Sequence, residues 1–180
     1  GLIVIPGLID IHVHGAGGFE FLSAKGQDDI AGIAKTLARL GTTSFLGTTV
    51  HWKDDSNISL IGSCVAKDLG GANLLGTHIE GPFINSKRRG GIQPDSILAP
   101  SEKTLRELMK IANSTVKIMG VAPEIDGVGP LLPVMKDMGI IPALCHTDAD
   151  YRQTKEGFKA GIRHVTHTFN AMRPLLHRDP

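Results

Sequence analysis

The sequence predicts an α/β fold built on a parallel β-sheet, and three observations lead to that class. Short apolar segments alternate with amphipathic segments along most of the 180 residues. Most connections between these segments are short, as is usual where helices link parallel strands. The composition, with 41% apolar and 21% charged residues, is typical of a soluble globular domain.

The elements follow one another from the N-terminus as strand, helix, strand. Residues 8–14 are apolar up to a pair of histidines and are predicted to form the first strand. Residues 28–40 are predicted to form a helix, because apolar side chains recur at helical spacing, Asp28 suits its start and Gly41 closes it. Residues 42–49 are rich in residues that favour strands and are predicted to form the second one.

The rest of the chain continues this alternation. Helices are predicted at residues 54–69, 101–112, 129–138 and 149–160, and strands at residues 73–80, 116–121, 140–145 and from 164 to 166. Ser101 is predicted to be the N-cap of its helix. The longest connection, residues 81–100, is basic and rich in Gly and Pro, and a loop of that length in a compact domain is usually functional.

About six βα units are therefore predicted, and they fit a partial TIM-type (β/α)8 barrel. A closed barrel usually takes about 250 residues, so the chain is interpreted as a single catalytic-barrel fragment covering residues 1–180. A six-stranded doubly wound sheet is the alternative. Its phosphate-binding fingerprint is missing, because the glycines at residues 15–18 have the wrong spacing.

Charge and cysteine content exclude several classes of protein. Lys and Arg number 19 and Asp and Glu 18, and aromatic residues make up 4%, so neither nucleic acid nor an anionic membrane is expected as a partner. The apolar residues at the start have no basic segment before them and stop at Pro6, which fits neither a signal peptide nor a membrane span. Cys64 and Cys145 match no disulfide framework, which predicts a cytoplasmic location.

Potential metal ligands stand at the carboxyl ends of four predicted strands. His12 and His14 end the first strand and, two residues apart, point to the same face. Glu80 ends the third strand, His146 follows the fifth and His167 the sixth. The carboxyl ends of parallel strands meet at one mouth of a barrel. Imidazoles with a carboxylate favour zinc, iron, manganese or cobalt over magnesium or calcium.

The other histidines are interpreted as structural. His78 lies two residues before Glu80 on the same strand face, deeper in the sheet, which favours a packing or supporting role. His51, His164 and His177 have no partner by spacing, and a structural or surface role is expected for them.

Four segments of this chain resemble those of a known enzyme family. They are Pro-Gly-Leu-Ile-Asp-Ile-His-Val-His-Gly at residues 6–15, His-Ile-Glu-Gly-Pro-Phe at 78–83, Val-Ala-Pro-Glu at 121–124 and Thr-His-Thr-Phe-Asn-Ala-Met at 166–172. The first resembles the opening of the metal-dependent amidohydrolase superfamily. Together, and in this order, they are similar to the N-acetylglucosamine-6-phosphate deacetylase family, which removes an acetyl group to give glucosamine 6-phosphate and acetate.

The resemblance implies roles for particular residues. It implies that Glu80, His146 and His167 bind a divalent metal, and that His12 and His14 hold a second ion. It also implies that a phosphorylated amino sugar binds at Gln93, Asn170, Ala171 and Arg178, where Arg178 takes the phosphate of a substrate bound to a neighbouring subunit of a homodimer.

The resemblance further implies what lies outside this chain. In the family an Asp after the eighth strand transfers the proton, and here that Asp is expected beyond Pro180, so none of residues 1–180 is expected to take this catalytic role. The family also has a small β-sandwich that flanks the barrel, and it too is expected outside these residues. The chain alone is therefore expected to be inactive.

Two alternatives stand beside this interpretation. One is another amidohydrolase, such as a dihydroorotase-like cyclic amidase, which would need a carboxylated lysine at the fourth strand, where Lys117 lies away from the mouth. The second is a non-catalytic truncated fragment, whose open sheet edges would favour aggregation.

Overall fold

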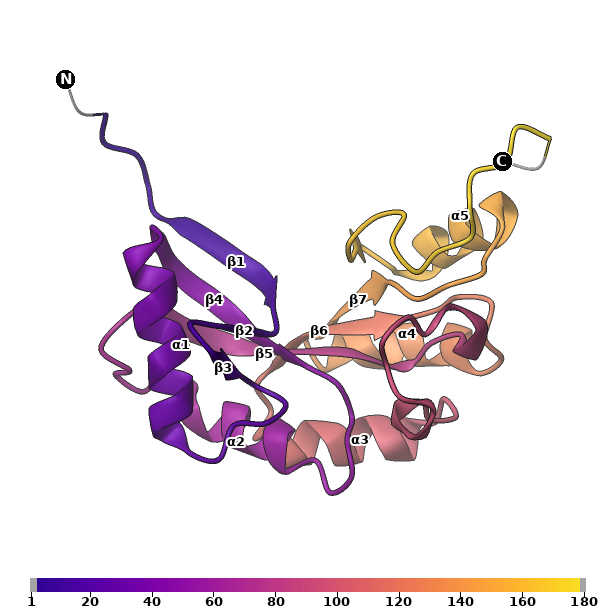
Figure 1. Ribbon diagram of the computed structural model, residues 1–180. Helices are drawn as coiled ribbons and strands as arrows, with labels where there is room; N and C mark the ends of the chain where they lie inside the picture. Colours follow the sequence, from indigo (N-terminus) through magenta and orange to yellow (C-terminus); the bar gives the residue numbers. More distant parts are fainter. Residues whose placement is uncertain (1–2, 179–180) are drawn as a thin grey trace.

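A six-stranded parallel sheet forms the centre of the molecule, with the strand order β1-β4-β5-β6-β7-β8. The computed structural model describes residues 3–178. Figure 1 shows the sheet crossing the molecule from β1 to β7, with helices packed along its outside. Each strand of this sheet pairs in parallel with the strand that follows it in the sheet. All the carboxyl ends therefore lie on one edge. The predicted α/β class and partial barrel are confirmed.

The elements alternate as predicted. The sheet strands are β1 (Leu8–Val13), β4 (Thr42–Thr49), β5 (Asn73–Phe83), β6 (Val116–Val121), β7 (Ile141–Leu144) and β8 (His164–Val165). The helices are α1 (Gln27–Arg39), α2 (Ser56–Cys64), α3 (Glu102–Ile111), α4 (Val128–Asp137) and α5 (Tyr151–Ala160). Ser101 caps α3 as predicted, since its hydroxyl accepts a hydrogen bond from the backbone N–H of Thr104 at 3.1 Å. None of the described helices combines the length and apolar character that a membrane span requires.

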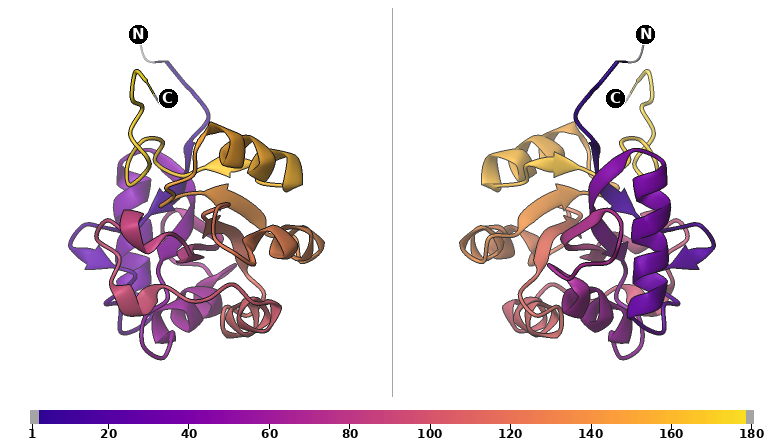
Figure 2. Two further views of the ribbon diagram at one scale, coloured as in Figure 1. Left: turned by 90° about the vertical axis from the view of Figure 1, so that its right-hand side faces the viewer. Right: turned by 90° about the vertical axis from the view of Figure 1, so that its left-hand side faces the viewer.

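The sheet is curled, and the helices lie on its convex side (Figure 2). Two apolar clusters fill the space between sheet and helices. One centres on α1 and β4 and includes Phe21 and Phe45, and the other joins α3 and α4 to β5 and β6. Since these clusters hold the strands from outside, the concave face and the carboxyl ends of the strands are left for other contacts.

Four parts of the chain differ from the prediction. A short hairpin, β2 (Gly15–Ala16) and β3 (Phe19–Glu20), follows the first strand, which ends one residue earlier than expected. Strand β5 continues three residues beyond Glu80, so the carboxylate lies within a strand rather than at its last residue. Helix α2 is shorter than predicted, because Asp55 before it and Ala66 after it take left-handed backbone conformations (φ 56° and 62°). The predicted loop at 81–100 contains two 3₁₀ turns, η1 (Ser86–Arg88) and η2 (Pro94–Ser96).

Candidate metal centre

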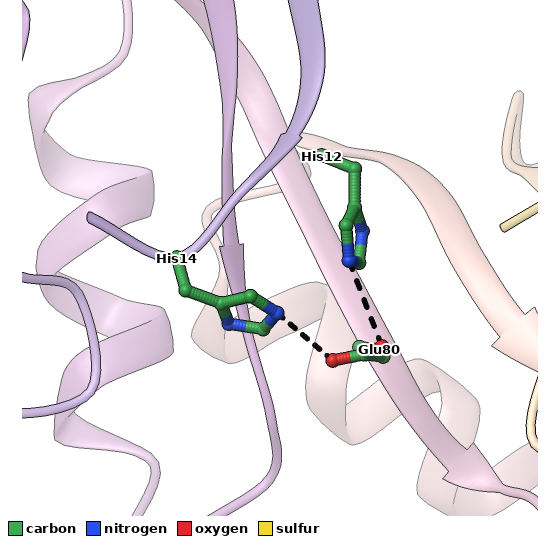
Figure 3. A group of neighbouring side chains, drawn as sticks. All are labelled: His12, His14 and Glu80. Atoms are coloured by element: carbon green, nitrogen blue, oxygen red, sulfur yellow. Dashed lines mark ion pairs between the residues drawn. The ribbon is translucent and has the colours of Figure 1, made fainter. Parts of the chain in front are cut away.

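Glu80 lies at the centre of the candidate site, where four histidines converge on its carboxylate. The Nε2 atom of His14 lies 3.0 Å from Oε2, and that of His12 lies 3.6 Å from Oε1. Figure 3 shows these two side chains reaching Glu80 from the end of β1, which lies two strands away in the sheet. The period of two along β1 therefore places both rings on one face, as predicted.

The other two histidines approach the same carboxylate from β7 and β8. The Nε2 atoms of His146 and His167 lie 3.0 Å and 2.7 Å from Oε1 of Glu80. Their rings lie edge to face, 5.0 Å apart, and His12 lies 5.4 Å from His167. All five candidate ligands, which come from four strands or the residues directly after them, therefore lie in one cluster.

The hydrogen bonds of His146 show what this cluster requires. Its Nδ1 atom lies 2.8 Å from the backbone carbonyl of Arg88, and its Nε2 atom lies 3.0 Å from Glu80. Both neighbours are acceptors, so a neutral imidazole, which has one N–H, satisfies only one of them. A proton or a metal ion must supply positive charge between Nε2 and Glu80. With Nδ1–H donated to Arg88, the lone pair on Nε2 is directed at the carboxylate, which is the arrangement of a metal-binding histidine.

The pKa shifts in the cluster favour an ionised Glu80 with positive charge beside it. Burial alone would raise the pKa of the Glu80 carboxyl, but hydrogen bonds from His14, His146 and His167 hold that pKa far below its usual range. Burial opposes a charge on His146, yet its bonds to Glu80 and to the Arg88 carbonyl raise the pKa of its ring. Burial lowers the pKa of His12, which favours its neutral form. A fixed anion beside imidazoles is a donor set that suits a divalent transition metal.

Two overlapping groups could each hold a metal ion. One consists of His12, His14 and Glu80, the other of Glu80, His146 and His167, and within each group the ligand atoms lie within 4.8 Å of one another. A tetrahedral zinc ion with its usual bond lengths would hold its ligand atoms about 3.4 Å apart, close to the distances between Glu80 and the four rings. The residues present therefore fit one or two ions.

The end of β1 is held in place by residues that bind no ligand. The backbone N–H of Val13, between the two histidines, donates to Oγ1 of buried Thr48 at 3.0 Å, where the pairing with β4 is irregular. His78, fully buried, binds the Ile11 carbonyl through Nδ1 at 2.8 Å, and burial lowers its pKa to about 4. The supporting role predicted for His78 matches these contacts. His51 also has a structural contact, 2.7 Å from Asp55.

Replacing Thr48 with Val is expected to destabilise the protein by about 1.5 kcal/mol, because the partly buried Val13 N–H then loses its partner. The measurement is the urea midpoint of unfolding. Thr43 on the same strand serves as control, since its exposed hydroxyl bonds Leu8 at 3.3 Å and its replacement by Val should change stability by less than about 0.5 kcal/mol. Equal losses in the two variants would contradict the role given to Thr48.

A cavity of about 720 Å³ opens beside the cluster. All five candidate ligands line it, and so do Gln93, Asn170 and Ala171, the residues predicted to contact a substrate. Arg178 is exposed and is not among the lining residues. The backbone around Asn170 and Ala171 is strained, with positive φ at His167, Phe169 and Ala171. Such strain is common where a loop is fixed by a binding site.

The cavity also has walls that the sequence interpretation did not single out. Apolar side chains of Leu22, Val50 and Trp52 line it, along with Thr49 and Ser96. Trp52 lies three residues after the end of β4. Its place just after a strand follows the rule that active sites gather at the carboxyl ends of strands, but an apolar side chain there does not indicate metal binding.

The proton-transferring Asp that the resemblance implies is expected beyond Pro180. Pro180 itself lies outside the described residues 3–178, so the place of that Asp stays a prediction. Within the described residues, Glu80 is the sole acidic side chain that lines the cavity, and the histidines occupy both of its oxygens. The described part of the site therefore has the groups for binding a metal ion but offers no free carboxylate for moving a proton.

Comparisons with known proteins agree with this geometry. The sequence model of the amidohydrolase family matches residues 3–179. The chain is 40% identical over 187 residues to N-acetylglucosamine-6-phosphate deacetylase of Bacillus subtilis, covering 99% of this chain and 46% of the relative. It is 33% identical to the human protein of that name, covering 100% of this chain and 46% of the relative. The chain thus spans about half the length of these relatives.

Solved structures show the same fold. N-acetyl-D-glucosamine-6-phosphate deacetylase of Mycobacterium smegmatis superposes with a TM-score of 0.86 at 32% identity, over 97% of this chain and 49% of that one. An aspartate-to-alanine mutant from the same organism, solved in complex with N-acetyl-D-glucosamine-6-phosphate, superposes with a TM-score of 0.87 over 98% of this chain and 46% of that one, again at 32% identity.

Proposed function

The chain belongs to the amidohydrolase family, whose members depend on metal, and we propose that the whole protein hydrolyses N-acetylglucosamine 6-phosphate to glucosamine 6-phosphate and acetate. One observation carries the proposal: Glu80 and the four histidines line the same cavity as Gln93, Asn170 and Ala171. The relatives that match along the whole chain carry this activity in their names.

The proposed metal ligands are Glu80, His146 and His167, with His12 and His14 holding a second ion. Their donor atoms suit zinc, iron, manganese or cobalt. A metal ion bound there would supply a Lewis acid for the acetyl carbonyl and lower the pKa of a bound water. Glu80 stays ionised and fixes the four rings, while the Arg88 carbonyl fixes the tautomer of His146.

The substrate is proposed to lie along the other wall of the cavity. Asn170, Ala171 and Gln93 would bind the sugar, and the apolar side chains of Leu22 and Trp52 would limit the entry of bulk water. We further propose that Arg178 binds the phosphate of a substrate held by a neighbouring subunit, as its exposed position outside the cavity allows. This arrangement requires a homodimer, which we propose to be cytoplasmic.

The reaction also needs a group that moves a proton from the water to the leaving amine. The family resemblance assigns this step to an Asp after an eighth strand, beyond Pro180. We therefore propose that residues 1–180 are one part of a catalytic barrel that the whole protein completes. The cyclic amidase alternative receives no support, because Lys117 lines a different cavity from Glu80.

The test compares N-acetylglucosamine 6-phosphate with plain N-acetylglucosamine as substrates of the metal-loaded whole protein. The kcat/KM is expected to be at least about tenfold higher for the phosphorylated sugar, since a charged hydrogen bond to phosphate contributes about 1.5–3 kcal/mol. Replacing Arg178 with Gln should remove most of this preference, whereas replacing the exposed Arg106, which pairs with Glu102 on α3, should leave it intact. Equal efficiency with both sugars would refute phosphate recognition, and no turnover of either would refute the proposed function.

A further inference from the structure

Glu124, which follows β6 and lies outside the cavity lining, holds two loops of the candidate site together. Its Oε1 accepts hydrogen bonds from Asn85 Nδ2 at 2.9 Å and from the backbone N–H of Asp148 at 2.6 Å. Its Oε2 accepts one from the hydroxyl of Thr147 at 2.6 Å. Asn85 belongs to the loop after β5, the strand of Glu80, and the other two residues directly follow His146. One half-buried carboxylate thus joins the segments on which two of the candidate ligands stand.

His146 needs such support, because its backbone is strained. It has a φ of +45°, a conformation that costs a residue with a side chain about 1 kcal/mol or more unless its surroundings enforce it. Its carbonyl accepts a hydrogen bond from the backbone N–H of Asn85 at 2.9 Å. The two bonds from Glu124 to Thr147 and Asp148 fix the chain immediately after it. The backbone of His146 is therefore fixed from the β5 loop and from Glu124.

A second set of contacts, between Arg88, Asp148 and His146, fixes the orientation of the imidazole. The guanidinium of Arg88 contacts Oδ1 of Asp148 through Nε at 2.8 Å and through Nη2 at 2.7 Å. The carbonyl of the same Arg88 accepts from Nδ1 of His146. Asp148, whose N–H binds Glu124, thus holds the residue that sets the ring's tautomer. Glu124 supports both the backbone of His146 and, through Asp148, the acceptor of its Nδ1–H.

We propose that Glu124 is a positioning residue that holds His146 ready to bind metal, and that it acts on affinity for the ion rather than on the reacting atoms. The inference rests on the proposed function only for the assignment of His146 as a ligand. Both oxygens of Glu124 are occupied by donors, and the residue does not line the cavity, so it is not a candidate for proton transfer. Residues that orient a metal ligand commonly contribute ten- to hundredfold to affinity.

The test measures Zn²⁺ affinity of the whole protein by competition with a chromophoric chelator. In Glu124→Ala the dissociation constant of Zn²⁺ should rise by about 10- to 100-fold. Glu124→Gln should show a smaller rise, because an amide keeps one acceptor oxygen but turns N–H groups toward donors. The visible spectrum of bound Co²⁺ should change in Glu124→Ala, since the geometry around His146 changes.

Asp150→Ala is the matched control. Asp150 lies in the same loop and caps α5, accepting from the N–H of Gln153 at 2.7 Å, but it contacts neither His146 nor Glu124 in any described hydrogen bond. It should lower the melting temperature and leave Zn²⁺ affinity within about twofold of the original, which separates ligand positioning from loss of stability. Unchanged Zn²⁺ affinity in Glu124→Ala, or equal weakening in the control, would overturn the proposal. If Glu124→Ala does not fold, Glu124→Gln decides by the same criterion.

These outcomes are independent of the reaction. A protein that binds Zn²⁺ through Glu124-supported His146 but does not deacetylate the sugar would disprove the proposed function and leave this inference standing. An active protein whose Zn²⁺ affinity is unchanged by replacing Glu124 would disprove this inference and leave the proposed function standing.

Discussion

Replacing Glu80 with Gln is expected to abolish metal binding at both candidate groups and to reduce kcat of the whole protein by at least about a thousandfold. Glu80 is common to the two groups, and the four Nε2 atoms lie 2.7–3.6 Å from its oxygens. The substitution removes the one anion of the cluster, so a divalent ion would face neutral imidazoles and an amide. Replacing a residue that only supports a ligand typically lowers metal affinity or activity ten- to hundredfold. A larger loss in Glu80→Gln would therefore identify Glu80 as a ligand.

The measurement is the Zn²⁺ content of the purified variant by elemental analysis, together with kcat. Glu107→Gln is the matched control, because Glu107 is exposed and pairs with Lys103 within α3 at 4.0 Å. The control should retain full metal content and activity, as surface pairs contribute little. Full Zn²⁺ occupancy in Glu80→Gln would show that the carboxylate does not hold the ion.

Replacing Gly120 with Ala is expected to destabilise the protein by about 3 kcal/mol, the upper end of what overpacking costs. Gly120 lies in β6 between the strands that carry Glu80 and His146. A Cβ there would clash with Sγ of Cys145 and lie 2.7 Å from the backbone nitrogen of Gly81. The thiol can rotate, but the backbone of Gly81 cannot move without moving Glu80. The variant should therefore lose stability and metal affinity together.

Urea denaturation and Zn²⁺ titration of the same preparation check this prediction. Gly129→Ala in α4 is the control, since no atom lies within 4 Å of a Cβ built there and helices favour Ala over Gly. That variant should be as stable as the original or slightly more so, with the same Zn²⁺ affinity. A stable Gly120→Ala variant would mean that β5 can move away from β6 without cost.

The sequence was sufficient to predict that the five candidate metal ligands lie together. His12, His14 and Glu80 stand at or near strand ends, and a parallel sheet brings such ends to one edge whatever the details of the loops. His146 and His167 follow from the same rule. Helix α1 was predicted for a similar reason, because helical periodicity is a local property.

Contacts between loops could not be predicted from the sequence. The acceptor of the His146 Nδ1 atom is a backbone carbonyl 58 residues away, and no residue type signals it. The role of Glu124 depends on three donors from two other loops, so the Val-Ala-Pro-Glu motif alone does not indicate it. The hairpin Gly15–Glu20 was missed because strands of two residues carry no periodic pattern.

Anomalous diffraction from crystals of the Zn²⁺-loaded whole protein tests the central claim most directly. A peak is expected between Glu80, His146 and His167, at about 2.0–2.2 Å from a carboxylate oxygen and from the two Nε2 atoms. At higher Zn²⁺ concentration a second peak should lie beside His12 and His14. Zinc bound elsewhere, with Glu80 still in direct contact with the four histidines, would contradict the account.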